Sequence, residues 1–468
     1  MTIMKKKIFY NYFVVLLLAV SFSCQKEFLE KKPDKALLVP ETLTDFQQLL
    51  DNSSQVMNFT PLLNSVSCDD VYIPDNIQVS FSPFQQKAYR WEKDIYEFTN
   101  IYNGDWDRPY QQVFYCNVVL EGLQSLSASE KASQAYKDIK GQALFARALA
   151  FYNLSQEYCA PYGSGNEGQQ LGIPLKLATD INAKTERATI EQTYRQIISD
   201  LEEAVELLPE KTQYLTRSSK PAALGLLARV YLSMRSYDKA GEFATKALEF
   251  NNKLLDYNII ASTGTYKMPR ALSNLNPEII FYSILSTTPI AFDNSVFIDT
   301  LLQKTYDDND LRKNLWFRVG ANGMLSFRGN YTGNSSVFTG IATDELMLIK
   351  AECLARQDKV TNAMKELNNL LVKRWKTNSA GNTLYIEQTA ATKGDAVKKV
   401  LLERRKELLW RNLRWTDLRR LNQEPDFAIT LRRVIAGQTI TLPPNDKKYV
   451  LPIPETIIAQ TGIQQNPR

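Results

Sequence analysis

Apolar residues recur at helical spacing over long parts of this 468-residue chain. In the segment 105–126 they fall three or four positions apart, which predicts a helix. The sequence Ser127-Ala-Ser-Glu130 then has the form of a capping box and predicts the start of a second helix, which extends to about Tyr158. Residues 143–154 of that helix are rich in alanine, as closely packed helix pairs require. Glycines and prolines in 161–174 predict a loop after it.

Small residues then repeat with a fixed spacing. Ala228, Ala240 and Ala247 fall where a tetratricopeptide repeat places its small residues. Residues 341–372 repeat part of this spacing, and 189–209 match half a unit. The units are degenerate and are separated by long insertions, unlike those of a regular solenoid. The pattern predicts a mainly α fold: a tetratricopeptide-like helical-repeat scaffold with long loop insertions and a few short β-strands.

The region 253–340 differs in character from the helical parts. It is dominated by Asn, Ser, Thr, Gly and Tyr, and short β-like runs occur at 279–285 and 325–328. Binding residues concentrate on loops that a rigid scaffold holds, so function is expected here. We therefore expect an N-terminal helical-repeat region at 41–252, this loop-rich insertion, and a C-terminal region at 341–468.

The N-terminus has the pattern of a processed export signal. Lys5-Lys6-Lys7 precede an apolar run from Ile8 to Phe22, which predicts a signal peptide over residues 1–23. A retained membrane helix is the alternative, but a span needs roughly 20 apolar residues. Cys24 directly follows the expected cut site and is predicted to be the lipid attachment site, with 24–40 as a short tether. A plain secreted protein with a free thiol is the other interpretation.

Charge and the missing histidines restrict the possible functions. Of 56 basic residues, three lie in 1–23, so 53 remain against 51 acidic ones, a charge of +2. This balance gives no reason to expect nucleic acid as a partner. The chain has no histidine, which excludes Ser-His-Asp and Cys-His nucleophiles and every His-ligated metal site. A glycosidase that uses only carboxylates stays possible. We expect no enzyme, no cofactor and no metal.

Four cysteines follow Cys24. The cell envelope is oxidising enough for disulfides. Three of the four nevertheless lie in apolar helical patterns, where a free buried thiol behaves as a small hydrophobic residue. We therefore expect no structural disulfide among Cys68, Cys116, Cys159 and Cys353.

The C-terminal part contains several segments with a family resemblance. Val400-Leu-Leu-Glu-Arg-Arg-Lys-Glu-Leu408 and Arg414-Trp-Thr-Asp-Leu-Arg-Arg420 resemble the glutamate-arginine helix and the R-x-x-D-L-x-R segment of SusD/RagB-like proteins. Tyr449-Val-Leu-Pro-Ile-Pro454 and Gln464-Gln-Asn-Pro467 are similar to the closing Pro-Ile-Pro and Gln-Asn-Pro elements of that family. Tyr306-Asp-Asp-Asn-Asp-Leu-Arg312 is similar to its central Asp-x-Arg segment.

These motifs also have a structural interpretation. Glu403, Arg404, Arg405 and Glu407 share a helix with several leucines, which suggests a charged face over a packed one. Asp417 and Arg420 are three positions apart and are expected to pair along one helix face. We expect fold stability to be their main role, with ligand or partner contact as the alternative. Asn412 stands where the family more often has glycine, which affects only the local turn.

The resemblance implies a specific function. SusD/RagB-like proteins are lipoproteins of the Bacteroidota outer membrane, exposed on the cell surface. They cap a SusC-like TonB-dependent transporter and bind oligosaccharides, or in some members peptides, for import. No bond is made or broken. The alternatives are a helical-repeat scaffold that binds only proteins and a carboxylate-only glycoside hydrolase.

Sugar recognition needs flat aromatic faces with amides and carboxylates nearby. Aromatics in polar, non-periodic segments are the candidates: Tyr72, Tyr89 and Trp91 first, then Phe292 and Tyr331. The alternative for each is an aromatic ring that fixes a loop to the scaffold.

Two acidic segments suggest other chemistry, a calcium site and a catalytic pair. Asp307-Asp-Asn-Asp310 suggests calcium, but the following residues lack the glycine and glutamate of an EF-hand loop. Asp69-Asp70 is a poor catalytic pair, because adjacent residues of an extended segment point apart.

Overall fold

The computed structural model describes residues 40–96, 103–261, 263–273, 275–286 and 289–468. The predicted signal peptide, the lipid attachment site Cys24 and most of the tether lie outside the described residues. Leu43–Arg468 form one compact unit. No helix within the described ranges combines the length and the apolar character that a membrane span requires.

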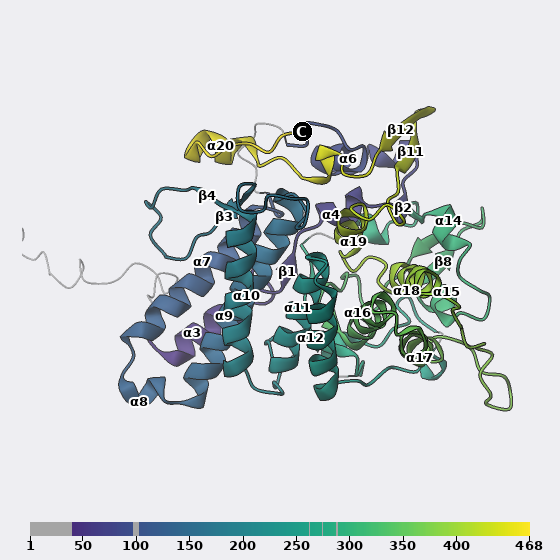
Figure 1. The fold of residues 1–468 in the computed structure, drawn as a ribbon, viewed down its shortest axis with the longest axis horizontal. Helices are drawn as coiled ribbons and strands as arrows, with labels where there is room; N and C mark the ends of the chain where they lie inside the picture. Colours follow the sequence, from purple (N-terminus) through teal and green to yellow (C-terminus); the bar gives the residue numbers. More distant parts are fainter. Residues whose placement is uncertain (1–39, 97–102, 262, 274, 287–288) are drawn as a thin grey trace, which may run out of the picture. The chain divides into compact units, whose positions relative to one another are not determined.

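Long helices that pack in sequence form the scaffold. In Figure 1 they follow one another from α7, α9 and α10 through α11 and α12 to α16, α17 and α18. Their bounds are α7 Asp107–Gly122, α9 Gln134–Tyr158, α10 Ile190–Leu207, α11 Lys220–Ser233, α12 Tyr237–Phe250, α16 Thr343–Arg356, α17 Val360–Leu371, α18 Lys393–Glu407 and α19 Arg414–Leu421. Shorter helices are α3 Leu43–Leu50, α4 Leu63–Ser67, α5 Asp75–Gln78, α6 Pro83–Tyr89, α8 Ala128–Lys131, α13 Pro289–Phe292, α14 Thr300–Gln303, α15 Leu311–Leu315 and α20 Glu455–Thr461.

The repeat spacing places small residues where helices meet. Ala228, Ala240 and Ala247 are fully buried. A Cβ atom at Gly241 would lie 2.9 Å from the Cβ of Cys353, so α12 and α16 approach each other closely at this point. The capping box of Ser127 is present and begins α8, while Ser133 caps the start of α9. The predicted second helix is therefore divided into two.

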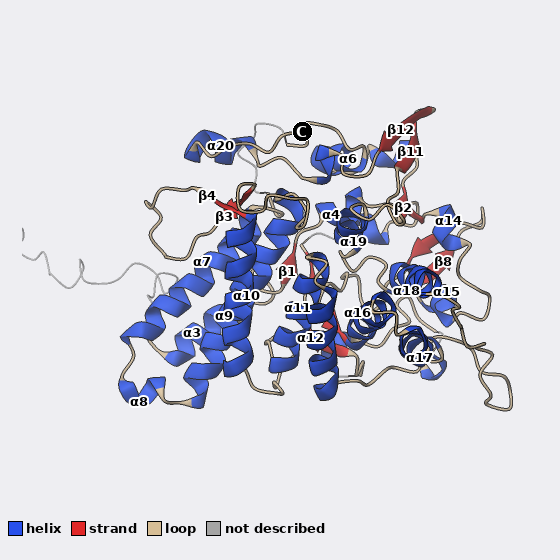
Figure 2. Cartoon of the chain, viewed as in Figure 1, coloured by secondary structure: helices blue, strands red, loops and turns tan. Residues whose placement is uncertain are grey.

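Short strands occur in five small sheets, as Figure 2 shows in red. The loop-rich region 253–340 contributes strands to three of them, and its runs 279–285 and 325–328 form strands as predicted. The sheets are β1 (Phe59–Thr60) with β6 (Ile284–Leu285), β5 (Ile279–Phe281) with β10 (Ile341–Ala342), β3 (Leu171–Pro174) with β4 (Arg187–Thr189), β11 (Leu431–Ile435) with β12 (Gln438–Leu442), and the four-stranded sheet of β2 (Val71–Tyr72), β7 (Phe297–Ile298), β9 (Leu325–Phe327) and β8 (Phe317–Val319).

The glutamate-arginine helix lies inside the fold. Glu403, Arg404 and Glu407 of α18 are buried, whereas Leu402 is 44 % exposed. The expected arrangement of a charged face over an apolar one is therefore wrong for these residues. Arg404 and Arg420 both donate to the Asp417 carboxylate at 2.8 Å, which confirms the predicted i,i+3 pair. The charges cross-link helices within the core instead of covering its surface.

The four cysteines after Cys24 are free and buried, with at most 3 % of each residue exposed. Cys116 and Cys353 lie within α7 and α16, and Cys159 directly follows α9. They pack among apolar residues, as expected of thiols that behave as small hydrophobic side chains.

Candidate binding cleft

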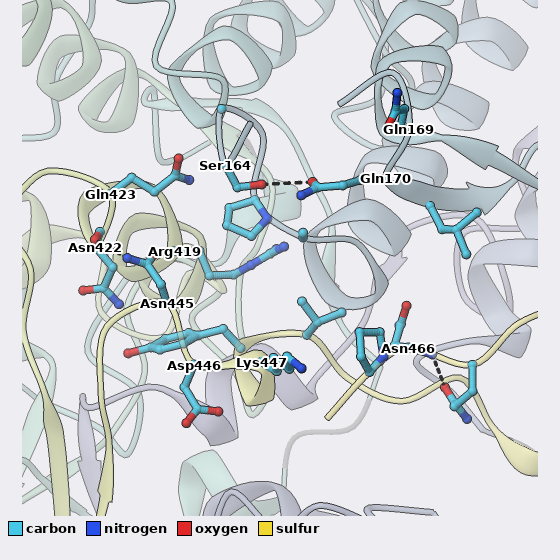
Figure 3. A pocket seen from close by; sticks show the side chains of 18 of the residues that line it. Ser164, Gln169, Gln170, Arg419, Asn422, Gln423, Asn445, Asp446, Lys447 and Asn466 are labelled. Atoms are coloured by element: carbon cyan, nitrogen blue, oxygen red, sulfur yellow. Dashed lines mark hydrogen bonds between the residues drawn. The ribbon is translucent and has the colours of Figure 1, made fainter. Parts of the chain in front are cut away.

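A cleft of ≈ 860 Å³ lies where five segments meet (Figure 3). These segments are the loop after α9, the start of β4, the C-terminal end of α19 with the residues that follow it, the residues 445–450 before the Pro-Ile-Pro residues, and the last residues of the chain. The lining residues are Ala160, Pro161, Gly163, Ser164, Gln169, Gln170, Leu171, Arg187, Arg419, Asn422, Gln423, Asn445, Asp446, Lys447, Tyr449, Val450, Gln464, Gln465, Asn466 and Pro467.

The two closing motifs hold one wall of this cleft in place. Gln465 accepts a hydrogen bond from the Ile453 amide at 2.7 Å and donates one to the Ile453 carbonyl oxygen at 2.8 Å. Asn466 donates to the carbonyl oxygens of Tyr158 and Leu451 at 3.0 and 2.8 Å. The Gln-Asn-Pro tail is thereby fixed to both the Pro-Ile-Pro segment and the end of α9.

Primary amides dominate the polar lining. Gln423 donates to the Tyr162 carbonyl oxygen at 3.3 Å, and its buried Oε1 accepts no hydrogen bond within the described residues. Gln170 accepts from the Ser164 hydroxyl at 3.0 Å. The buried Asn422 amide lies beside the Tyr449 hydroxyl. Since an amide offers both a donor and an acceptor, this lining suits ligands rich in hydroxyl groups.

Two arginines also line the cleft. Arg419 is 2 % exposed and donates to the backbone carbonyl oxygens of Gln156 and Cys159. Arg187 is half-buried, and its Nε donates to the Gly172 carbonyl oxygen at 2.7 Å. Desolvation by burial lowers the pKa of both guanidinium groups. Neither group loses its charge, because the ordinary pKa of arginine is above 12.

The structure separates the predicted aromatic candidates from this cleft. Tyr72 is 41 % exposed on β2, and Phe292 is half-buried against Phe327. Tyr89 and Trp91 are buried, and the guanidinium of Arg433 lies 3.7 and 4.4 Å from their ring centres. Ligand contact by any of these side chains stays a prediction, and at Tyr89 and Trp91 it requires a ring that is now covered to become accessible.

Tyr331, the remaining aromatic candidate, is fully buried and donates its hydroxyl hydrogen to Glu278. It stacks on Phe338 with 5.1 Å between ring centres. Its surroundings are a packed core and a charged network. Ligand contact there also stays a prediction.

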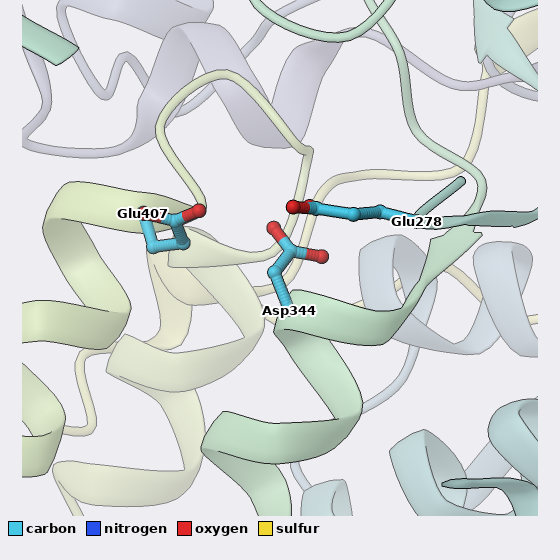
Figure 4. Close-up of side chains that lie close together, drawn as sticks. All are labelled: Glu278, Asp344 and Glu407. Carbon is cyan, nitrogen blue, oxygen red and sulfur yellow. The ribbon is translucent and has the colours of Figure 1, made fainter. Parts of the chain in front are cut away.

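Three buried carboxylates, Glu278, Asp344 and Glu407, each place an oxygen within 4.8 Å of the others (Figure 4). Arg374 bridges Glu278 and Glu407 at 2.9 and 2.7 Å, and Arg411 lies 3.0 Å from Asp344. Burial raises the pKa of Glu278 to about 7. The guanidinium groups already occupy the carboxylate oxygens that a cation would bind, so this cluster is an ion-pair network of the core.

The two acidic segments are also paired with arginines. Asp69 accepts hydrogen bonds from Arg414 at 2.7 and 2.9 Å, and Arg405 lies 3.0 Å from Asp70. Asp310 is buried against Arg312 at 2.7 Å. The contacts of Asp69 and Asp70 join residues 345 and 335 positions apart, so they fix an early segment of the fold to α19 and α18.

None of the aromatic candidates that the sequence offers lines this cleft. The sequence indicates the Gln464-Gln-Asn466 tail only as a family motif. The neighbouring amides of Gln169-Gln170 and Asn422-Gln423 were a compositional signal, but nothing in the sequence indicates that these pairs meet.

Residues 27–232 match the sequence model of the SusD-like family described as "Starch-binding associating with outer membrane". No curated protein sequence shows a significant match. Among solved structures, a putative sugar-binding protein from Bacteroides vulgatus is 23 % identical, with 92 % of this chain and 99 % of that chain covered and a TM-score of 0.71.

Two other solved structures are similar. A SusD superfamily protein from Bacteroides thetaiotaomicron is 21 % identical, with 91 % of this chain and 100 % of that chain covered and a TM-score of 0.71. The surface glycan-binding protein A from Bacteroides fluxus is 17 % identical, with coverages of 92 % and 100 % and a TM-score of 0.68. At these identities the likeness shows a shared fold.

Proposed function

We propose that this chain binds oligosaccharides or peptides outside the cell and delivers them to a SusC-like TonB-dependent transporter. The proposal is supported by the SusD-like character of the sequence over residues 27–232 and of the fold. The C-terminal motifs predicted this likeness. The observation that supports binding most directly is the amide-lined cleft of ≈ 860 Å³. Its volume is in the range of small-molecule sites, which is about 300–1,000 Å³.

The chemistry of the lining favours sugar. A sugar hydroxyl donates one hydrogen bond and accepts others, and the side-chain amides of the cleft can satisfy both roles. The family model is described as starch-binding, and two of the similar structures are named as sugar-binding and glycan-binding proteins. Oligosaccharides are therefore the first cargo to test.

The family description also supports a proposal for where the protein is located in the cell. The family is described as associating with the outer membrane. Acylation of Cys24 would hold the compact unit at that membrane, because each buried CH₂ of an acyl chain contributes about 0.8 kcal/mol. We propose that the anchored protein is exposed on the cell surface beside its transporter.

SusD-like binding proteins are non-catalytic. A carboxylate-only glycoside hydrolase is therefore the weaker candidate, and it makes a distinct prediction. Prolonged incubation with a bound glycan would release shorter sugars if the protein were a hydrolase. We expect the glycan to be recovered intact.

Calorimetric titration with a panel of oligosaccharides and peptides tests the binding function. Gln423→Ala removes an amide from the cleft and is expected to weaken binding of the best ligand about threefold to tenfold. Gln213→Ala, which removes an exposed glutamine outside the cleft, is the matched control and should bind like the unaltered protein. Absence of binding across the panel would favour a scaffold that binds only proteins.

A second experiment tests the partner. Purification of the tagged protein from outer membranes should co-purify a large β-barrel transporter. A protein found only in soluble or inner-membrane fractions would contradict the proposed location.

A further inference from the structure

The charged side chains that line the cleft are unbalanced. Arg187, Arg419 and Lys447 are cations, and Asp446 is the single carboxylate among the lining residues of the described structure. Asp446 accepts a hydrogen bond from the backbone amide of Lys448 at 2.9 Å, so it caps its own turn. The cleft therefore has an excess of two positive charges.

Elsewhere in the fold, most buried arginines are paired with carboxylates. Arg147 contacts Asp200 at 2.8 Å and Arg229 contacts Glu345 at 2.7 Å. The same holds for Arg312 with Asp310, Arg374 with Glu407, Arg404 with Asp417, Arg411 with Asp344, Arg414 with Asp69 and Arg420 with Glu352.

The two cleft arginines differ from this pattern. Within the described residues, the hydrogen bonds of Arg187 and Arg419 lead to backbone carbonyl oxygens and to the side-chain amide oxygen of Gln156, and none leads to a carboxylate. Figure 3 shows Arg419 among the amide side chains of the cleft. Arg433 also donates to carbonyl oxygens, but aromatic rings lie against its guanidinium.

Glu157 acts on the charge of Arg419, but no ion pair joins the two side chains within the described residues. Glu157 is fully buried in the last turn of α9. Burial raises the pKa of its carboxyl well above the usual value, and the neighbouring Asp105 raises it further. Burial thus disfavours the charged form of Glu157, and in the part of the chain that the structure describes no carboxylate forms a hydrogen bond or ion pair with Arg419.

A cation that is partly removed from water and left without a counter-charge is unfavourable, and an arriving anion relieves this cost. The N–H groups of Arg187 and Arg419 largely donate to carbonyl oxygens already, so the two arginines attract an anion mainly through their charge, while the exposed Lys447 side chain can contact it directly. The amides beside them supply partners for hydroxyl groups. The cleft thus combines recognition of negative charge with recognition of hydroxyls.

We infer that the cleft binds oligosaccharides that contain uronic acid units, with the sugar carboxylate directed at Arg187, Arg419 and Lys447 and the hydroxyls at the amides. This inference rests on the proposed function and narrows its cargo. A peptide would offer a carboxylate only at its end and at acidic side chains, and few hydroxyls, so the amide lining favours the sugar.

Titration calorimetry with paired probes tests the inference. The probes are oligogalacturonate and oligomannuronate, each with its fully methyl-esterified form, together with neutral gluco-oligosaccharides and one peptide with a free or an amidated C-terminus. We expect at least one acidic oligosaccharide to bind about tenfold tighter than its ester. Its affinity should fall when NaCl is raised from about 50 mM to about 500 mM, because salt screens charge.

Charge variants locate the effect. Gln170→Glu places a carboxylate of nearly the same shape in the cleft and should weaken binding of the acidic probe about tenfold more than it weakens binding of the ester. Gln213→Glu makes the same change outside the cleft and should leave both unchanged. Lys447→Glu should also weaken the acidic probe, whereas Lys448→Glu, at the adjacent residue that does not line the cleft, should not.

The outcomes distinguish a failure of the uronate inference from a failure of the proposed binding function. If the esters or the neutral oligosaccharides bind as tightly as the acids, or bind when no acid does, the protein is a glycan-binding protein and the uronate inference is wrong. If only the peptide with a free C-terminus binds, the cargo is peptide. If no probe binds, the proposed function fails together with the inference.

Discussion

The side-chain amide of Asn466 donates a hydrogen bond of 3.0 Å to the carbonyl oxygen of Tyr158, a residue 308 positions earlier in the chain. Tyr158 ends α9, so its carbonyl group has no acceptor role within the helix. The tail supplies one donor to this oxygen, Arg187 supplies a second at 3.3 Å, and the tail at the same time forms a wall of the cleft. One contact thus serves both the end of a scaffold helix and the candidate binding site.

Asn466→Ala removes two hydrogen bonds from buried carbonyl groups, those of Tyr158 and Leu451. We expect the free energy of unfolding to fall by about 1–3 kcal/mol, because the Leu451 carbonyl oxygen would lose its donor and the Tyr158 carbonyl oxygen would keep only Arg187, at 3.3 Å. Chemical denaturation measures this change. Gln464→Ala alters an exposed side chain of the same tail and should change stability by less than about 0.5 kcal/mol. Equal effects of the two variants would contradict the assigned role.

Arg374→Met removes the cation from a buried ion-pair network and leaves its carboxylate partners in place. Arg374 is fully buried and contacts Glu278 and Glu407, which would both lose a counter-charge. We expect a loss of about 3–5 kcal/mol in the free energy of unfolding. Lys373→Met removes the ion pair of the adjacent residue with Asp256. Because the Lys373 side chain is 43 % exposed, this change should lower the free energy of unfolding by at most about 1 kcal/mol. A small effect of Arg374→Met would show that the network is not closed to water.

Asp105 makes stability depend on pH in an unusual direction. Burial raises the pKa of this carboxyl to about 6, while backbone amides of Leu62 and Leu63 donate to it. The folded state therefore holds a proton that the unfolded state releases near pH 3.8, and this contribution to stability is lost as pH rises to about 6. We expect Asp105→Asn to gain about 1–3 kcal/mol relative to the unaltered protein between pH 4 and pH 7.

Denaturation at a series of pH values measures the Asp105 effect. The asparagine side chain keeps an oxygen that can accept from both amides, so the variant isolates the charge. Asp426→Asn, at an exposed aspartate, should show no comparable change over the same range. A difference between Asp105→Asn and the unaltered protein that stays constant with pH would contradict the raised pKa.

Helical periodicity identified the scaffold because long helices bury one face at regular spacing. The fully buried Ala240 and Ala247 of α12 are examples, and their size is explained by the close approach to neighbouring helices. The same reasoning failed for α18, where Glu403 and Glu407 lie inside and Leu402 is partly exposed. A prediction from hydrophobic periodicity assigns charged residues to the surface, because it does not include the partners that can pair with them in the core.

Those partners are far away in sequence. Arg312 binds Glu403 and Glu407 across 91 and 95 positions, and no local spacing indicates such pairs. The cleft is also formed by residues far apart in sequence, since its walls include Ser164 and Asn466. Family motifs identified the segments that matter, but only the fold shows that the tail motif closes a cavity.

The buried cysteines should react slowly with thiol reagents. Burial raises the pKa of Cys159 to about 11 and that of Cys116 to about 12, and the thiolate is the reactive form. We expect labelling of these two residues in the native protein to be at least about a hundredfold slower than in denaturant. Peptide mapping by mass spectrometry reports each cysteine separately, so labelling of Cys24 does not interfere. Rapid native labelling of Cys116 would show that α7 opens readily.

Tyr72 tests whether an exposed aromatic ring outside the cleft takes part in binding. Its side chain is 41 % exposed on β2 and is a flat surface on which a sugar ring can stack. If the bound oligosaccharide extends to this strand, Tyr72→Ala should weaken its binding about threefold to tenfold, as measured by calorimetry with the tightest-binding probe. Tyr214→Ala, at a tyrosine that is 51 % exposed in the loop before α11, is the control and should bind normally. Unchanged affinity in Tyr72→Ala would confine recognition to the cleft, because β2 is then outside the footprint of the ligand.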